Sequence, residues 1–325
     1  MIGRRTSILF RNKRFFHSQP KSLVETHEEF LTLVNDHGQG NVHFQKHAGH
    51  VEIILDNPSK RNAVSGKMMV QFAKIIDEIL PIHPWDRSAE ESSMVGVVIT
   101  GAGTEAFCAG ADLGLVKEII NTPIRGGLMS AFMTDALNRL RESNLISICC
   151  LNGPALGGGA EIVTACDFRV MSNDAYVQFV HAKIGASPGW GGARRLTNII
   201  GRTNALLLCA ASVKVNAQES QFIRLIDGIY NPYTEENTEN AKTPVEYNCL
   251  QGVKYLQPFL QQKFPGSVRA IKLAIAGTEY LDTKSSMELE AEIFRQRWAG
   301  NDNKSALGGS SNSSSSTSSG TSSSK

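Results

Sequence analysis

The chain has 325 residues, of which 41% are hydrophobic and 20% charged, and its formal net charge is +2. That length allows one large domain or two ordinary ones with a sizeable buried core. No apolar run approaches the roughly 18 residues of a membrane-spanning helix, and the charge lacks the basic excess of a dedicated nucleic-acid binder, so we expect neither a membrane nor a nucleic-acid partner.

Both ends of the chain are predicted to lie outside the folded body. Residues 1–20 carry +5 and residues 301–325 carry +1, which leaves −4 for residues 21–300. Arg, Ser and large apolar side chains mix in residues 1–20, as in a mitochondrial presequence, although an ordinary disordered basic leader has the same composition. From Ser305 the chain is almost wholly Ser, Gly and Thr and buries too little surface to offset its ordering entropy. We therefore expect residues 305–325 to be a disordered tail.

Between residues 42 and 300, predicted strands and helices alternate. In chain order we expect a strand at 51–55, a helix at 68–79, a strand at 95–100, a helix at 129–140, a strand at 146–151, a mostly helical stretch from about 198, a surface loop at 231–244 and an amphipathic helix at 285–298. This pattern predicts an α/β core over 42–230 and a helical C-terminal region over 245–300.

Cysteine and histidine positions give no sign of a metal centre. The six cysteines form no C-x-x-C pair and mostly lie in apolar segments, which favours a reduced intracellular protein. His43, His47 and His50 cluster near the start of the core. Because no carboxylate or thiolate pattern accompanies them, we interpret them as polar positions on and beside an early strand, and expect no metal.

Two junctions share one design, in which a buried strand leads through a glycine-rich turn into a helix. The strand at 95–100 leads through 101–112 to a helix near Leu113, and the strand at 146–151 leads through 153–159 to a helix that carries Glu161. The first N–H groups of a helix are unpaired and lie at its positive end. Two such turns that face each other can direct two N–H donors at one oxygen, as in an oxyanion hole.

Two other glycine patterns do not fit the functions they suggest. Gly101-x-Gly103-x-x-Ala106 matches a dinucleotide fingerprint, but its helix starts about ten residues too late and no acidic residue follows at the next strand. The pattern around Ser187 matches a nucleophile elbow, but Pro188 has no N–H to serve as an oxyanion donor. We therefore expect neither a nicotinamide cofactor nor a serine hydrolase.

Four motifs in order resemble the enoyl-CoA hydratase/isomerase (crotonase) superfamily over about residues 42–300: NPSKRNA at 57–63, FCAGAD at 107–112, NGPALGGGAE at 152–161 and PGWGG at 188–192. Within it, ACDFR at 165–169, FVH at 179–181 and WAG at 298–300 are most similar to the branch that decarboxylates ethylmalonyl-CoA. The resemblance implies a crotonase (ClpP-like) spiral of ββα units, a helical C-terminal region that builds homotrimers or hexamers, and acyl-CoA substrates. It implies no cofactor beyond the substrate's own coenzyme A, and a cytosolic location that competes with the mitochondrial interpretation of residues 1–20.

Carried over position by position, the resemblance assigns a set of site residues. The backbone N–H groups of Ala111 and Gly158 become the oxyanion donors, and Glu161 and His181 the catalytic side chains. A first-turn Glu that complements the helix dipole is the alternative for Glu161, and a hydrogen-bonded core residue the alternative for His181. The implied substrate contacts are Lys60, Ala109, Ala111, Asp112, Leu113, Gly157, Gly158 and Trp190, with Lys60 or Arg61 either at CoA phosphates or in a solvated turn.

His181 stands where hydratases carry their second carboxylate, and this departure decides the predicted reaction. Hydration needs one group to activate water and another to protonate carbon, commonly two glutamates. Decarboxylation needs a held thioester, a poorly solvated carboxylate and later a proton. We therefore expect decarboxylation of a short branched malonyl-type thioester, with Trp190 as an apolar wall and His181 holding the carboxylate or supplying the proton. An enoyl-CoA hydratase or isomerase, and a non-catalytic acyl-CoA- or RNA-binding protein of the same fold, stay open as alternatives.

Overall fold

The structure, a computed structural model, describes residues 23–34, 36–80, 93–238 and 241–308. The predicted leader and residues 309–325 of the predicted tail lie outside the described residues. The main sheet has six strands, all paired in parallel except the first hairpin. In sheet order they are β1 (Asn41–His47), β2 (His50–Asp56), β3 (Gly96–Gly101), β4 (Ile146–Leu151), β6 (Phe168–Ser172) and β9 (Gly228–Tyr230).

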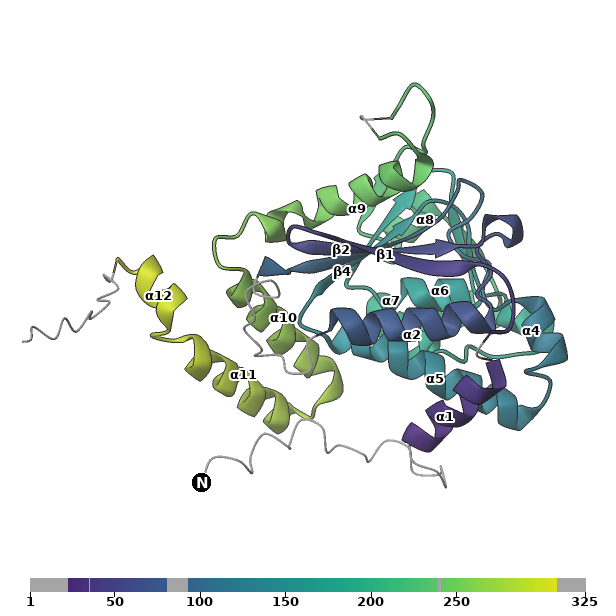
Figure 1. Cartoon of the computed structure of the whole chain (residues 1–325), viewed down its shortest axis with the longest axis horizontal. Coiled ribbons are helices and arrows are strands. Elements are labelled where there is room, and N and C mark those ends of the chain that lie inside the picture. The colour runs from purple at the N-terminus through teal and green to yellow at the C-terminus, as the bar shows by residue number, and fades with distance from the viewer. Residues whose placement is uncertain (1–22, 35, 81–92, 239–240, 309–325) are drawn as a thin grey trace, which may run out of the picture.

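Helices cover both faces of this sheet (Figure 1), as expected for buried parallel strands. Every residue of β3 and β4 is buried, and successive side chains of β3 point to opposite faces. Val97 and Ile99 pack with α2 (Gly66–Ile79) and α5 (Pro123–Glu142), whereas Val98 packs with α9 (Pro244–Leu260). The predicted strands at 51–55, 95–100 and 146–151 and helices at 68–79 and 129–140 are confirmed as β2, β3, β4, α2 and α5.

The segments between strands carry the remaining short elements. A second sheet contains β5 (Ala155–Leu156), β7 (Tyr176–Gln178) and β8 (Lys214–Asn216). The helices are η1 (Pro58–Lys60), α4 (Leu113–Glu118), α6 (Gly158–Val163), η2 (Val180–Ile184), α7 (Gly192–Ala210) and α8 (Ala217–Phe222). Among the described residues, no helix is both long and apolar enough to cross a bilayer.

The folded body starts earlier than residue 42. Helix α1 (Leu23–Val34) packs on α5, with Phe30 and Val34 fully buried. The rings of Phe30 and Phe132 lie 4.7 Å apart. No element was predicted before residue 42, although residues 23–34 include six apolar positions.

Beyond α9, the helical C-terminal region contacts the core through α10 (Pro265–Tyr280). The buried Lys272 on α10 forms an ion pair with Asp167 and donates to the carbonyl oxygen of Arg141 at 2.9 Å. The guanidinium of Arg141 in turn forms an ion pair with Glu279 at 2.7 Å. Beyond α10, the predicted amphipathic helix is confirmed as α11 (Thr283–Arg297), which projects away from the α/β body (Figure 1).

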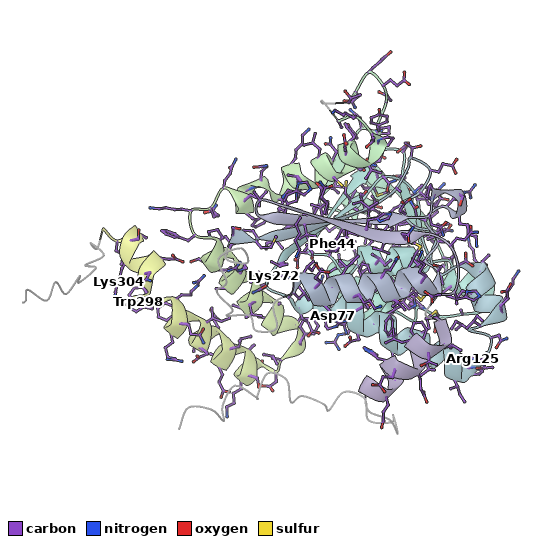
Figure 2. All side chains as sticks on the ribbon, in the orientation of Figure 1. Phe44, Asp77, Arg125, Lys272, Trp298 and Lys304 are labelled. Atoms are coloured by element: carbon purple, nitrogen blue, oxygen red, sulfur yellow. The ribbon has the colours of Figure 1, made fainter. Side chains whose placement is uncertain are left out.

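The last described helix extends further than predicted. Helix α12 (Asn301–Ala306) includes Ser305, so the tail expected from that residue does not begin there. The Asn303 side chain accepts the N–H of Ala299 at 3.0 Å, and this local contact supports one more helical turn than the composition suggested. Trp298 stands exposed between α11 and α12, at the end farthest from the core (Figure 2).

Candidate active site

The first glycine-rich turn, which follows β3, is held in shape by two buried asparagines. Asn62 donates to the carbonyl oxygens of Ala102 and Ala106 at 2.9 and 2.8 Å. Asn152, from the second turn, donates to the carbonyl oxygen of Gly103 at 2.9 Å. Side-chain amides therefore satisfy backbone groups that no strand or helix pairs, and they fix the path of the turn.

The two glycine-rich turns run side by side, as their shared design predicted. The N–H of Leu156 donates to the carbonyl oxygen of Cys108 at 2.9 Å. A Cβ atom on Gly110, whose φ is +95°, would lie 3.1 Å from the nitrogen of Gly158. Only a residue without a side chain permits this approach in this backbone conformation.

This arrangement brings the two predicted oxyanion donors, Ala111 and Gly158, to neighbouring backbone positions. Gly158 is the first residue of α6, and its N-cap Gly157 has no side chain to accept a hydrogen bond. Within residues 23–34, 36–80, 93–238 and 241–308, neither the N–H of Ala111 nor that of Gly158 has a hydrogen-bond partner. Both N–H groups are thus available to an incoming oxygen.

The Glu161 carboxylate is buried and surrounded by donors. Its Oε1 accepts the N–H groups of Trp190 at 2.7 Å and Gly192 at 2.9 Å. Its Oε2 accepts the N–H of Gly189 at 3.3 Å and lies 3.0 Å from Nε2 of His181. The segment 188–192 leads into α7, so the carboxylate occupies the positive end of that helix. These four contacts fix the orientation of the carboxylate.

His181 on η2 has one hydrogen-bonded and one available ring nitrogen. Because an ionised carboxylate only accepts hydrogen bonds, Nε2 carries the proton that faces Glu161. The other nitrogen, Nδ1, is buried and has no hydrogen-bond partner in the part of the chain that the structure describes. The whole residue is only 8% exposed. An imidazole in this setting has a fixed orientation and one nitrogen left for a ligand.

Trp190 lies directly beneath the oxyanion turn. Its side chain is buried, and a Cβ atom on Gly158 would lie 2.6 Å from Cη2 of its indole ring. The ring therefore limits how closely the Gly158 backbone can approach it.

Arg195 is a site residue that the sequence analysis missed. It is buried on α7 and donates to the carbonyl oxygen of Trp190 at 2.5 Å and to that of Glu161 at 3.3 Å. Its other donors reach Thr164 at 3.1 Å and Asn138 at 3.0 Å. Burial lowers the pKa of Arg195 to about 10, so the guanidinium stays protonated at neutral pH. The sequence signal that could have identified Arg195 is a positive charge near a helix N-terminus, a position where the helix dipole disfavours cations.

The predicted CoA contacts Lys60 and Asp112 bind each other. Nζ of Lys60 lies 2.7 Å from Oδ2 of Asp112, while Oδ1 caps α4 by accepting the N–H groups of Gly114 and Leu115 at 2.8 and 3.1 Å. Burial acts to raise the pKa of Asp112, but these hydrogen bonds and the Lys60 charge outweigh it and lower that pKa. The Lys60 side chain is 45% exposed, so it also faces solvent at the rim.

The remaining predicted contacts lie around an open cleft. Ala109 lines a cleft of about 420 Å³ together with Arg61, Leu156 and Tyr176. Leu113, at the start of α4, exposes 64% of its surface beside the turns. The predicted residues therefore group into a buried Glu161–His181 pair, two backbone donors and a rim that faces solvent.

Comparison with known proteins agrees with this geometry. Residues 45–239 match the enoyl-CoA hydratase/isomerase family. The chain belongs to this family. It is 33% identical to an ethylmalonyl-CoA decarboxylase from Bos taurus over 302 residues, which are 91% of each chain. It is 35% identical to another from Danio rerio over 271 residues, 82% of this chain and 83% of the relative.

Solved structures confirm the predicted crotonase fold. An enoyl-CoA hydratase from Bacillus anthracis superposes with a TM-score of 0.69 at 23% identity, covering 82% of this chain and 95% of its own. A family member from Thermobifida fusca, solved in complex with acetoacetyl-CoA, superposes with a TM-score of 0.61 at 20% identity, covering 83% and 96%.

Proposed function

We propose that the protein decarboxylates a short branched malonyl-type thioester, ethylmalonyl-CoA or methylmalonyl-CoA, to butyryl-CoA or propionyl-CoA and CO2. The observation that carries this proposal is the Glu161–His181 pair, in a chain about one-third identical to ethylmalonyl-CoA decarboxylases over most of its length. The position opposite Glu161 holds an imidazole, not the second carboxylate that water addition uses.

The two backbone donors suit the first step. When the bond between the α-carbon and the carboxylate breaks, its electron pair moves into the thioester and forms an enolate. The N–H groups of Ala111 and Gly158, unpaired in the described chain, receive the enolate oxygen. Preorganised donors of this kind stabilise such a transition state by several kcal/mol.

His181 suits the second step, in which the enolate takes up a proton at the α-carbon. Nε2 is bound to the Glu161 carboxylate at 3.0 Å, which fixes the ring and leaves Nδ1 as the nitrogen that can deliver a proton to the α-carbon. After transfer the imidazole is neutral and regains a proton from solvent. Glu161 acts as a positioning residue, because four donors already occupy the oxygens with which it would activate a water molecule.

Turnover assays on the purified full chain test this proposal. Ethylmalonyl-CoA should release CO2, and crotonyl-CoA should be hydrated slowly. Fast hydration without CO2 release would instead identify a hydratase. Inactivity on both substrates, together with retained CoA binding, would identify a non-catalytic binding protein. His181→Gln preserves a hydrogen-bonding side chain but removes the proton donor, so kcat should fall by about 10²–10⁴. The exposed His43→Gln is the matched control and should retain full turnover.

The C-terminal helices support assembly as a homotrimer, with a hexamer as a pair of trimers. Helices α10 and α11 and the residue that follows them expose large apolar side chains that water disfavours: Ile271, Ile275, Met287, Phe294 and Trp298. Light scattering coupled to size exclusion should give the mass of three or six chains. A monomer at micromolar concentration would contradict this part of the proposal.

A further inference from the structure

A second group of chemically competent side chains lies at the tip of the β1–β2 hairpin, and the proposed reaction does not use it. His47 ends β1, His50 begins β2, and the two residues are directly paired across the strands. Glu52 follows two positions after His50 and therefore projects from the same face of the strand. No metal was expected here, because the sequence shows no carboxylate or thiolate pattern beside the histidines. In the fold, the hairpin places Glu52 beside both imidazoles.

The spacing of the three side chains suits a small metal ion. Nε2 of His47 lies 3.1 Å from Oε2 of Glu52, and Nε2 of His50 lies 3.5 Å from Oε1 of Glu52. One ligand atom from each of the three residues lies within 4.8 Å of the other two. Tetrahedral ligands about 2.0–2.1 Å from Zn²⁺ are themselves about 3.3 Å apart. The observed separations bracket that value, so binding requires no movement of the backbone.

The imidazoles also lack other partners. His50 is 8% exposed, and the polar contacts of its ring and of Nε2 of His47 within the described chain are those with Glu52. A bound ion would give one nitrogen of each buried ring a stronger partner, which matters because weakly paired buried polar atoms are costly.

One ring must turn for both nitrogens to reach the same ion. The His47 and His50 rings are stacked 4.7 Å apart with an interplanar angle of 7°, so their lone pairs run parallel. The His47 side chain is 34% exposed, so part of it faces solvent. On the other side, the thiol of Cys249 on α9 lies beside the Glu52 carboxylate.

We propose that His47, His50 and Glu52 bind one divalent transition-metal ion, with water as a further ligand. Two imidazoles and a carboxylate are a ligand set that Zn²⁺ accepts readily. The bound ion joins β1 to β2 next to α9, far along the chain from Glu161 and His181, and its role is to stabilise the hairpin.

Zinc titration of the full chain, with any histidine tag removed and after EDTA treatment and dialysis, tests the proposal. Calorimetry should show one Zn²⁺ per chain, and zinc should raise the midpoint of thermal unfolding. His47→Gln and Glu52→Gln should each weaken the zinc Kd at least tenfold and abolish the thermal shift. Unfolding scans in EDTA verify that both variants are folded.

His43→Gln is the matched control, because His43 lies on the same strand and is bound to Asp56 at 2.9 Å, outside the cluster. This variant should bind zinc as the wild type does. Absence of stoichiometric binding, equal affinity in His47→Gln and Glu52→Gln, or equal loss in His43→Gln would each overturn the proposal.

Discussion

Glu161→Gln tests the pairing at the centre of the proposed mechanism with little change in shape. The amide oxygen of Gln can take the place of Oε1 and keep the hydrogen bonds from Trp190 and Gly192 at 2.7 and 2.9 Å. The NH2 group then replaces Oε2, next to the N–H of Gly189 and Nε2 of His181. The variant thus loses its charge, the long bond from Gly189 and the charge-assisted bond to His181.

These losses set the expected magnitudes. A hydrogen bond to a charged group contributes about 1.5–3 kcal/mol, so the free energy of unfolding should fall by about 2–3 kcal/mol. Without the carboxylate the His181 ring loses the contact that orients it, and loss of a positioned proton donor lowers kcat by about 10²–10⁴. That factor corresponds to about 3–5 kcal/mol in the activation free energy. The affinity for CoA should stay unchanged, because the Glu161 side chain is buried behind the N–H groups that donate to it.

Three measurements on the same preparation separate the possible outcomes. CO2 release from ethylmalonyl-CoA gives kcat and KM, urea unfolding gives stability, and calorimetry gives the CoA Kd. Glu236→Gln, on the exposed loop before α9, is the control for a lost carboxylate. A Glu161→Gln protein that is folded, binds CoA and turns over within threefold of the wild type would refute the role assigned to Glu161.

Further substitutions probe the surrounding structure. Gly158→Ala should lower the free energy of unfolding by about 1–3 kcal/mol through overpacking and lower kcat by about 10²–10³, because its Cβ atom would lie 2.6 Å from Cη2 of the Trp190 ring. A variant that unfolds in urea and releases CO2 as the wild type does would contradict this. Asp112→Asn removes the ion pair with Lys60. Because folding lowers the pKa of Asp112 below 3.8, the stability that this carboxylate contributes to the wild type is present above that pH and is lost as the pH falls below it. The stability difference from wild type should therefore shrink in unfolding experiments between about pH 6 and pH 3, and a pH-independent difference would refute the assignment. Arg195→Lys leaves at least one of four buried acceptors unpaired, because an ammonium has three donors. The free energy of unfolding should therefore fall by about 1–3 kcal/mol, and an unchanged urea midpoint would contradict the network.

The elements that the sequence predicted well are those with strong local signals. β3 and β4 are continuous apolar runs bounded by glycine or asparagine, and α2 and α5 repeat apolar residues at helical spacing. The glycine-rich turns were predictable for the same reason, since glycine is required where two backbones approach closely. Helix α1 carries a comparable pattern, since Phe30 and Val34 are buried at helical spacing, but the apolar stretch is short and its burial depends on contact with α5.

Contacts between distant segments were beyond the reach of sequence patterns. Glu161 was identified as a candidate carboxylate, but nothing in its neighbourhood shows that Trp190 and Gly192 donate to it. The same applies to Arg195, whose four acceptors come from three different elements. At the hairpin tip, Glu52 was not recognised as a neighbour of His47 and His50, because their proximity depends on the tight turn that joins the two strands.

The unequal anchoring of Glu161 and His181 has a consequence for how this scaffold can acquire other reactions. Glu161 is bound to three backbone N–H groups, so its replacement disturbs the entry to α7. His181 lies on a short 3-10 helix, and its ring makes a single hydrogen bond, to Glu161, in the described chain. A glutamate introduced at position 181 would face the Glu161 carboxylate, and two carboxylates held close together must share a proton. Position 181 is therefore where directed evolution can convert the site toward water addition while the thioester-binding turns stay intact.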